Sequence, residues 1–216
     1  MRSFLISRYI YFMCVSVFFL YTGNNVLAQG ATKSGRVVRK ILVIRKLTGL
    51  GSRAKINTPR YGTSASNDQK PPKEWVKIET TYDTDPEWID NLEFRYYAIS
   101  VRKEKGKNAY TFYKVTSKYA DIEKGRDYLS AVYLRPAAIE RYGELMGVAV
   151  EILHDGKVIE TKAENHKSMS KTMQADWWKN PKITGSELVT IKTGYLFKKI
   201  ETPFQYVDID DHAYEK

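Results

Sequence analysis

Cysteine is almost absent from this sequence of 216 residues. The one thiol, Cys14, lies inside an apolar run near the start, and no lipobox-like leucine and small residue precede it at a cleavage point. A chain without a second cysteine cannot form an internal disulfide, so its fold must depend on its own hydrophobic core. The chain from residue 73 onward is long enough to build one.

Histidine is scarce as well, and its spacing does not suit a metal. His154, His166 and His212 are not spaced like the ligands of a zinc site. Calcium has two candidate sites, an acidic turn and an acidic tail, and neither follows an EF-hand pattern. A solvated acidic surface is the favoured interpretation of both, so we expect no metal and no cofactor. The two groups consist of Asp83 and Asp85, and of Asp208, Asp210, Asp211 and His212.

Motifs for catalysis are also missing. The sequence has no Gly-x-Ser-x-Gly elbow for a nucleophilic serine, and its glycines after residue 120 are isolated rather than grouped into a phosphate-binding loop. His166, Ser168 and Ser170 share a polar segment, but spacing alone does not establish a triad. Paired carboxylates of a glycosidase leave no mark in one sequence, although the region is small for such an enzyme. We therefore expect a protein that is not an enzyme, and a small hydrolase is the least favoured interpretation.

What the sequence does contain begins with an export signal. Arg2 and Arg8 precede an apolar run over residues 9–21, and Ala28 ends a Val-Leu-Ala stretch that suits a signal peptidase. The run is short for a membrane-spanning helix, which needs about 20 apolar residues. The pattern predicts a signal peptide over residues 1–28, cleaved after Ala28, and an exported protein in the periplasm or at the cell surface.

Positive charge is concentrated in the segment that follows. The chain has a formal net charge of +10, yet residues 30–73 alone carry eleven lysines and arginines against one acid, Asp68. From residue 74 onward, 22 basic and 24 acidic residues nearly balance. A nucleic-acid-binding domain is expected to carry its positive charge on the folded surface, so this distribution argues against a nucleic-acid partner.

Residues 29–72 are expected to form a basic arm and linker. Residues 36–47 are basic and β-branched, which suits a strand better than an amphipathic helix, and residues 48–72 have the composition of a flexible linker. The arm is a candidate for docking on an anionic membrane surface, an acidic partner or the sheet edge of another subunit. The alternatives are a solvated tether and an arm that orders only against its own domain. The candidate contact residues are Arg39, Lys40, Arg45 and Lys46.

Residues 73–216 have the pattern of a series of short strands. Period-two alternation predicts strands over residues 75–82 and 88–102, separated by a turn at residues 83–86. The apolar phase of the second strand shifts between Tyr96 and Tyr97, which predicts either a bulge or burial of both faces. Further segments are expected as strands over 110–119, 127–134, 188–192, 195–200 and 204–209, a helical turn or two over 137–144, and a hairpin around Asp155-Gly156.

This succession of about eight short strands, with turn signals between them and no long helix, predicts the fold class. Hairpin connections favour antiparallel pairing, and the strand at 127–134 is apolar on both faces, as a central strand would be. The sequence therefore predicts an all-β antiparallel sandwich over residues 73–216.

Aromatic residues are plentiful, with 16 tyrosines and 4 tryptophans. Trp177 and Trp178 stand together in a polar segment and are the candidate binding residues, because exposed aromatic rings stack on sugars or anchor protein interfaces. The competing interpretation is that the pair fills a core, as large aromatic residues usually do. Trp75 and Trp88, on either side of the expected turn, are interpreted as packing residues.

Several short motifs in this region resemble a known family. They are similar to motifs of the small exported proteins of verrucomicrobial bacteria that are found with type IV pilus genes. The resemblance spans about residues 74–211, does not include the basic arm, and implies an immunoglobulin-like β-sandwich without catalytic residues to carry over. The motifs are Trp75, Tyr82, Trp88-Ile89-Asp90, Leu92-Glu93-Phe94-Arg95-Tyr96-Tyr97, Trp177-Trp178 and Thr202-Pro203-Phe204.

These observations favour a non-enzymatic, exported β-sandwich that mediates protein–protein interaction at the cell envelope, in a pilus or secretion assembly. The partner would be an envelope protein or a second copy of the chain, bound through sheet edges and exposed aromatic residues. The alternative is a carbohydrate-binding module in which Trp177 and Trp178 hold a glycan.

Overall fold

A computed structural model describes residues 40–60, 71–169, 176–207 and 213–214. The described residues all lie within one compact unit, Arg39–Lys216. The expected signal peptide, Arg39 and the acidic group from Asp208 to His212 lie outside the described residues.

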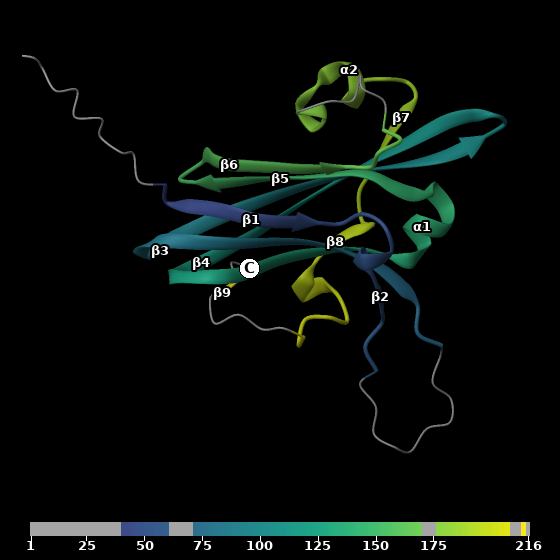
Figure 1. The fold of residues 1–216 in the computed structure, drawn as a ribbon. Helices are drawn as coiled ribbons and strands as arrows, with labels where there is room; N and C mark the ends of the chain where they lie inside the picture. Colours follow the sequence, from purple (N-terminus) through teal and green to yellow (C-terminus); the bar gives the residue numbers. More distant parts are fainter. Residues whose placement is uncertain (1–39, 61–70, 170–175, 208–212, 215–216) are drawn as a thin grey trace, which may run out of the picture. The chain divides into compact units, whose positions relative to one another are not determined.

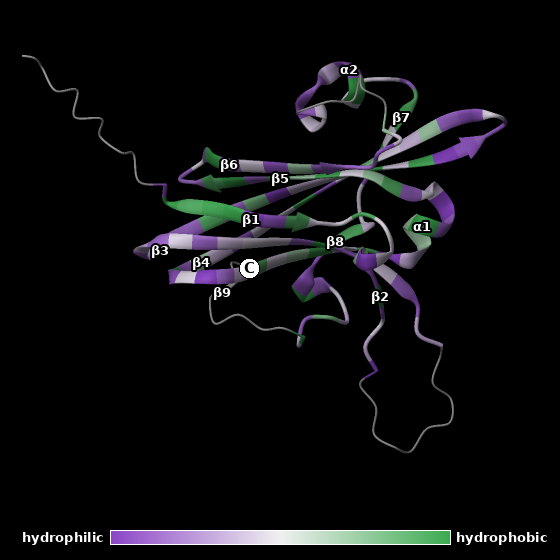
Figure 2. Cartoon of the chain, viewed as in Figure 1, coloured by the Kyte–Doolittle hydropathy of each residue, from purple (hydrophilic) through white to green (hydrophobic). Residues whose placement is uncertain are grey.

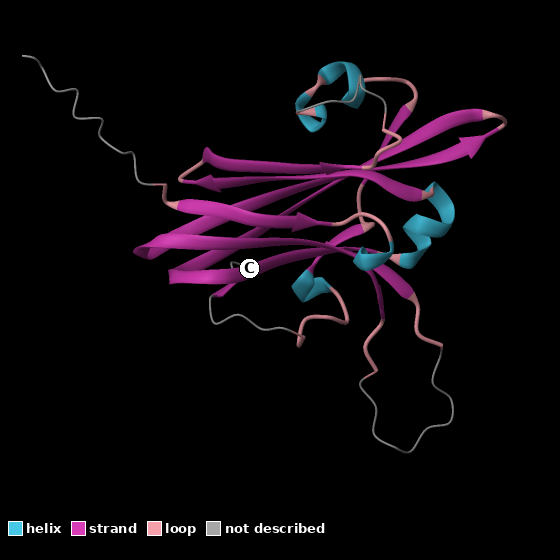
Figure 3. Cartoon of the chain, viewed as in Figure 1, coloured by secondary structure: helices cyan, strands magenta, loops and turns pink. Residues whose placement is uncertain are grey.

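Within the described residues, nine strands join one sheet, and short helices occupy its connections (Figure 1, Figure 3). The strands are β1 (Leu42–Thr48), β2 (Lys55–Asn57), β3 (Glu74–Glu104), β4 (Lys107–Leu134), β5 (Glu144–His154), β6 (Lys157–Asn165), β7 (Val189–Lys192), β8 (Leu196–Lys198) and β9 (Ala213–Tyr214). The helical segments are η1 (Ser52–Ala54), α1 (Pro136–Tyr142), η2 (Trp177–Lys179), α2 (Pro181–Thr184) and η3 (Lys199–Glu201).

The fold is built on two long strands, β3 and β4, which pair from Val76↔Leu134 to Glu104↔Lys107. The pair turns back on itself, because the rings of Tyr82 and Phe94 have centroids only 5.0 Å apart. In a straight strand, residues twelve positions apart would be separated by about 40 Å. The expected turn at residues 83–86 is therefore a corner inside one strand, where the register shifts between Tyr82 and Trp88.

This corner gives the two long strands a place in both layers of a sandwich. Before the corner, β3 pairs with β1, β2 and the last part of β4, which also pairs with β8. After the corner, β3 pairs with β5, and the order of the path is β6-β5-β3-β4-β7. The all-β, mostly antiparallel sandwich is confirmed, although both layers belong to one sheet and β7 pairs with β4 in parallel.

The main core lies between the two layers. Apolar and polar residues alternate along β3 and β4 (Figure 2), so that each strand turns one face inward. The Tyr96 hydroxyl of one layer lies 2.9 Å from the hydroxyl oxygen of Thr80 and 2.9 Å from the carbonyl oxygen of Ser130 in the other. These buried polar contacts fix how the layers face each other.

The phase shift between Tyr96 and Tyr97 reflects burial on both faces. The register of β3 with β4 runs without interruption from Asn91↔Ala120 to Glu104↔Lys107, so no bulge occurs there. Tyr96 packs in the main core, whereas Tyr97 and Ile99 belong to a second buried cluster on the other face. The cover on that face comes from the segment that contains η2.

The turn and helix signals in the sequence correctly predicted two of the connections. Asp155 and Gly156 have the positive φ angles of a tight hairpin, 50° and 73°, between β5 and β6, and α1 occupies most of the expected helical turn. The expected last strand is different, because residues 204–207 form turns rather than a strand. Its last two residues lie outside the described part.

Two described stretches of the expected arm, β1 and β2, are part of the sheet. β1 pairs antiparallel with β3, and its residues Leu42, Ile44 and Leu47 are buried in the main core. The Lys162 ammonium donates to the carbonyl of Arg45 at 2.8 Å, which ties β1 to β6. β1 therefore belongs to the same sheet and core as the chain from residue 73 onward, because its apolar side chains pack there.

Candidate functional site

Trp177 and Trp178 are buried, with 1% and 6% of their surface exposed. Trp177 packs edge-on against Phe112 and Trp178 lies nearly parallel to Tyr97, with ring centroids 6.0 and 6.3 Å apart. The prediction of an exposed aromatic platform is therefore corrected. The pair fills the second cluster on the outer face of the layer that contains β5.

A buried carboxylate holds this pair in place. Glu151 accepts hydrogen bonds from the Trp178 indole N–H at 3.1 Å and from the Tyr97 hydroxyl at 3.0 Å, and the Lys179 ammonium lies 2.8 Å from it. Burial raises the pKa of Glu151, but the hydrogen bonds from Lys179, Trp178 and Tyr97 outweigh it, so the net pKa is lowered. Burial and the hydrogen bond to Glu151 raise the pKa of Tyr97 well above its ordinary range.

The segment that begins with Trp177 and Trp178 continues through α2 into β7. Asn180 caps α2 by accepting from the Lys182 amide at 2.9 Å, and the Val189 amide donates to the carbonyl of Ser186 at 3.0 Å. Trp177 and Trp178 therefore fix the start of the segment, and the turn after α2 places β7 against β4.

The β7 edge combines exposed apolar side chains with open main-chain groups. Leu188 and Ile191 are 61% and 56% exposed. The Leu188 carbonyl accepts from the Tyr110 amide at 3.0 Å, so in a parallel ladder Thr190 also faces β4, and Val189 and Ile191 face away from it. By the same alternation, the N–H and C=O of Ile191 point away from β4, toward the outer edge of β7.

The opposite edge of the same layer, β6, is protected differently. Charged residues recur along this strand, as natural edge strands require to prevent unwanted pairing. Lys162 bonds to β1, and Glu160 pairs with Lys40 at 3.1 Å. β7 has no charged residue before Lys192. Of the two strands that end the path, β7 is therefore the better suited to accept another strand.

The basic candidates from the arm have partners in their own chain. Lys40 pairs with Glu160, and the Arg45 Nε donates to the Asp83 carboxylate at 2.6 Å. This hydrogen bond holds the pKa of Asp83 below its ordinary value. Lys46 is exposed, and Arg39 lies outside the described residues. The structure thus places two of the four residues in internal contacts and does not gather the set into one site.

The two other tryptophans differ from each other. Trp75 packs as expected against Phe204, with ring centroids 5.8 Å apart, and its indole N–H donates to the Thr58 hydroxyl. Trp88 lies at the corner of β3 and is 56% exposed, so its interpretation as a packing residue is corrected.

The sequence patterns located the β7 strand but missed Leu188 and Ile191. A short strand with apolar residues on both faces is typical of a buried position, and only the sheet order shows that β7 lies at an edge.

The described residues contain no group of three or more histidine, cysteine, aspartate or glutamate side chains that could hold a metal ion. Of the candidate calcium residues in that part, Asp83 is bound to Arg45 and Asp85 pairs with Lys124 at 3.5 Å. Among the same residues, no helix is long and apolar enough to cross a membrane.

An all-β sandwich with an exposed edge strand, β7, is the class of protein that this geometry defines. A family model matches residues 51–216, and the chain belongs to that family. Among solved structures, a crystal structure of a protein from Akkermansia muciniphila matches with a TM-score of 0.64 and 21% identity, over 81% of this chain and 93% of that chain. At this identity the likeness shows the fold. The organism of that structure is a verrucomicrobe, which agrees with the resemblance of the sequence motifs to proteins of verrucomicrobial bacteria. No curated protein matches the sequence.

Proposed function

We propose that this chain is a non-enzymatic, exported β-sandwich that binds a protein partner at the cell envelope by accepting a strand at the β7 edge. The observation that carries the proposal is the exposed edge of β7, with Leu188 and Ile191 beside the open main-chain groups of Ile191. A partner strand would satisfy these groups and cover the two apolar side chains, which is the basis of strand-addition binding.

Export and the type of assembly are part of the same proposal. The pattern of residues 1–28 supports secretion to the periplasm or the cell surface, and the resemblance to exported proteins found with type IV pilus genes supports a pilus or secretion assembly. The partner is then an envelope protein, and a second copy of this chain is an outcome that the experiment would reveal.

The carbohydrate-binding alternative has lost the residues on which it depended. Stacking on a sugar needs an exposed ring face, but less than 10% of the surface of Trp177 and of Trp178 is exposed, and both belong to a buried cluster. Anionic-membrane docking by the arm is weakened in the same way, because Lys40 and Arg45 are paired internally.

The test is site-specific photo-crosslinking in the native host. A photoreactive residue replaces Thr190 on β7, and a control replaces Thr161 on β6, since both positions are exposed threonines in edge strands of the same layer. We expect Thr190 to yield one discrete crosslinked protein that Thr161 does not.

The captured partner is then purified and its affinity is measured with Ile191→Pro, which removes the outward N–H. We expect at least a tenfold loss, about 1.4 kcal/mol, whereas Val158→Pro on β6 leaves the affinity unchanged. Equal crosslinking at both positions, or none at Thr190, would overturn strand addition at β7.

A further inference from the structure

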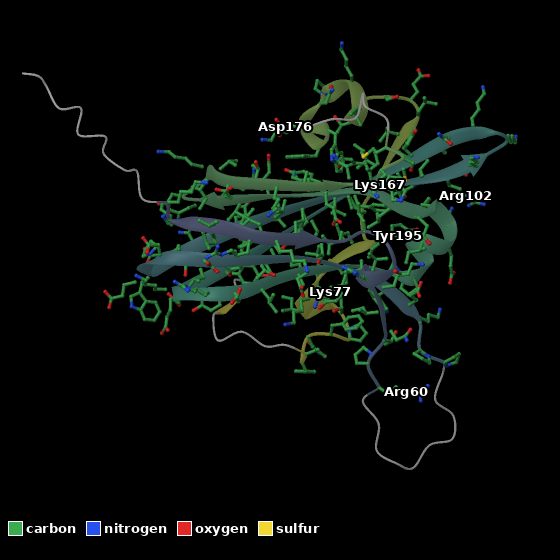
Figure 4. The ribbon with its side chains drawn as sticks, in the orientation of Figure 1. Arg60, Lys77, Arg102, Lys167, Asp176 and Tyr195 are labelled. Carbon is green, nitrogen blue, oxygen red and sulfur yellow. The ribbon has the colours of Figure 1, made fainter. Side chains whose placement is uncertain are left out.

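Two tyrosines close the sandwich at the end where α1 lies. Tyr142 ends α1 and Tyr195 directly precedes β8. Their rings meet edge to face, with centroids 5.3 Å apart, and Tyr142 donates its hydroxyl hydrogen to the Tyr195 oxygen at 3.3 Å. Figure 4 labels Tyr195 and, at the same end of the sandwich, Arg102.

Cationic side chains surround these rings. The Arg141 guanidinium lies 5.4 Å and the Lys192 ammonium 6.0 Å from the ring centre of Tyr142. The Arg135 guanidinium lies 5.8 Å from the ring centre of Tyr195. We call Arg135, Arg141, Lys192, Tyr142 and Tyr195 the cation–tyrosine cluster.

Nearby carboxylates do not neutralise the cluster. No ion pair joins Arg135, Arg141 or Lys192 to an acid among the residues that the structure describes. Glu140 precedes Arg141 in the chain without pairing with it, and Glu144 is engaged by Lys55 at 3.2 Å. Three cations thus remain available to an anionic ligand.

The hydrogen bonding of Tyr195 also favours an anionic ligand. Its phenol oxygen accepts from Tyr142, and this bond lowers the pKa of Tyr195, as do the charge and hydrogen bond of Arg141 and the charge of Lys192, against the opposing effect of burial. Since that oxygen already accepts a hydrogen bond, its own O–H is left to donate. A donor within a positive field is what a carboxylate requires.

The cluster is continuous with the β7 edge. Lys192 is the last residue of β7, and three residues later the chain reaches Tyr195. A strand laid along the outer edge of β7 would pass Ile191 and Lys192 in succession, and its next residues would meet the cluster. The apolar edge and the anion site would then contact one ligand.

From this continuity we infer the chemistry of the partner: its docking segment is an extended strand that becomes acidic where it passes Lys192, so that aspartate or glutamate carboxylates bind Arg141, Lys192 and the Tyr195 hydroxyl. The inference rests on the proposed strand addition at β7 and specifies what is added. Charge complementarity of this kind sets partner choice and register.

Selection from a displayed library of random decapeptides tests the inference on the chain from Gln29, at about 0.15 M salt to suppress unspecific attraction. The double variant Arg141→Gln/Lys192→Gln removes two charges of the cluster. The matched control, Lys103→Gln/Lys105→Gln, removes two exposed charges at the hairpin end, one from the end of β3 and one from the turn between β3 and β4. We expect selected peptides with an apolar half and an acidic half.

Binding of these peptides should weaken at least tenfold in the cluster variant and in Ile191→Pro, and stay within twofold in the control. Selected peptides that need Ile191 but carry no acidic residues would overturn the inference and keep strand addition. Acidic peptides that need the cluster but not Ile191 would overturn strand addition at β7. Peptides affected equally by both double variants, or no selected peptides, would overturn the inference.

Discussion

At the scale of single residues, Glu151 decides how the covering segment is attached. It is a buried acid with three donors from two parts of the chain: Tyr97 on β3, and Trp178 and Lys179 in η2. A charged acceptor strengthens each of these bonds. The covering segment is thereby joined to the outer face of the sheet by polar contacts as well as by apolar packing.

Glu151→Ala should lower the free energy of unfolding by about 3 kcal/mol at pH 7, because it leaves the Tyr97 hydroxyl and the Trp178 indole N–H buried without an acceptor, at roughly 1–3 kcal/mol each. Urea unfolding measures the change. Glu160→Ala is the control, since its pair with Lys40 is exposed on the lysine side and should contribute less than about 1 kcal/mol. A loss no larger than that of Glu160→Ala would contradict the assigned role.

The same variant has a predictable pH dependence. Because the pKa of Glu151 is lower in the folded state, its contribution is fully present above the unfolded value of about 4.3 and is lost as the pH falls through the lower folded value. The stability difference between the two proteins should therefore shrink below about pH 4.3. A difference that is constant across this range would contradict the lowered pKa.

Residue types predicted this site only in part. The Trp177-Trp178 pair was conspicuous in the sequence, but its burial depends on Tyr97 and Phe112, which lie about 65 to 80 positions earlier. Glu151 looked like an ordinary polar position in an alternating strand. Which carboxylate is buried is a property of the fold that one sequence does not reveal.

At the scale of elements, the connection from α1 to β5 depends on Gly143. Its φ of 84° is in the left-handed region, and a Cβ atom there would lie 2.1 Å from the Val101 carbonyl oxygen. Gly106, in the turn between β3 and β4, has a similar φ of 79°, but a Cβ atom would meet nothing within 4 Å. Comparing an alanine substitution at each glycine therefore separates the cost of backbone strain from the cost of the steric conflict with Val101.

Gly143→Ala should therefore destabilise the protein by at least about 3 kcal/mol, since the backbone of β3 must move as well, whereas Gly106→Ala should cost about 1–2 kcal/mol from the left-handed conformation alone. Thermal unfolding followed by circular dichroism compares them. Equal losses would show that the contact between Gly143 and Val101 is not a constraint.

Elements were predictable where the signal was local. The Asp155-Gly156 hairpin and α1 follow from turn and helix chemistry within a few residues. The corner at residues 83–86 has the same aspartates and proline as a turn, so local chemistry did not distinguish a bend within one strand from a turn between two. The edge position of β7 follows only from the sheet order.

At the scale of the whole folded unit, β1 is required to complete the sandwich. Its buried residues Leu42, Ile44 and Leu47 cover the core beside β3. Loss of one buried leucine or isoleucine side chain costs about 2–5 kcal/mol, and the total stability of a domain is about 5–15 kcal/mol. Three such losses approach the whole stability.

A chain that starts at residue 73 should accordingly not fold cooperatively, whereas a chain that starts at residue 40 should. Near-ultraviolet circular dichroism and dispersion of amide proton resonances report the difference. Cooperative unfolding of the shorter chain would show that β1 is dispensable and that residues 73–216, the range predicted from the sequence, suffice for folding.

The corner in β3 has a consequence for the motions of the molecule. β3 and β4 each run through both layers. The two layers therefore cannot separate unless the hydrogen bonds of these shared strands are broken. Central amides of the two layers should therefore exchange with deuterium at one common slow rate, set by global unfolding. Amides of β7, held on one side only, should exchange much faster, so that this edge opens to solvent while the rest of the sandwich remains closed.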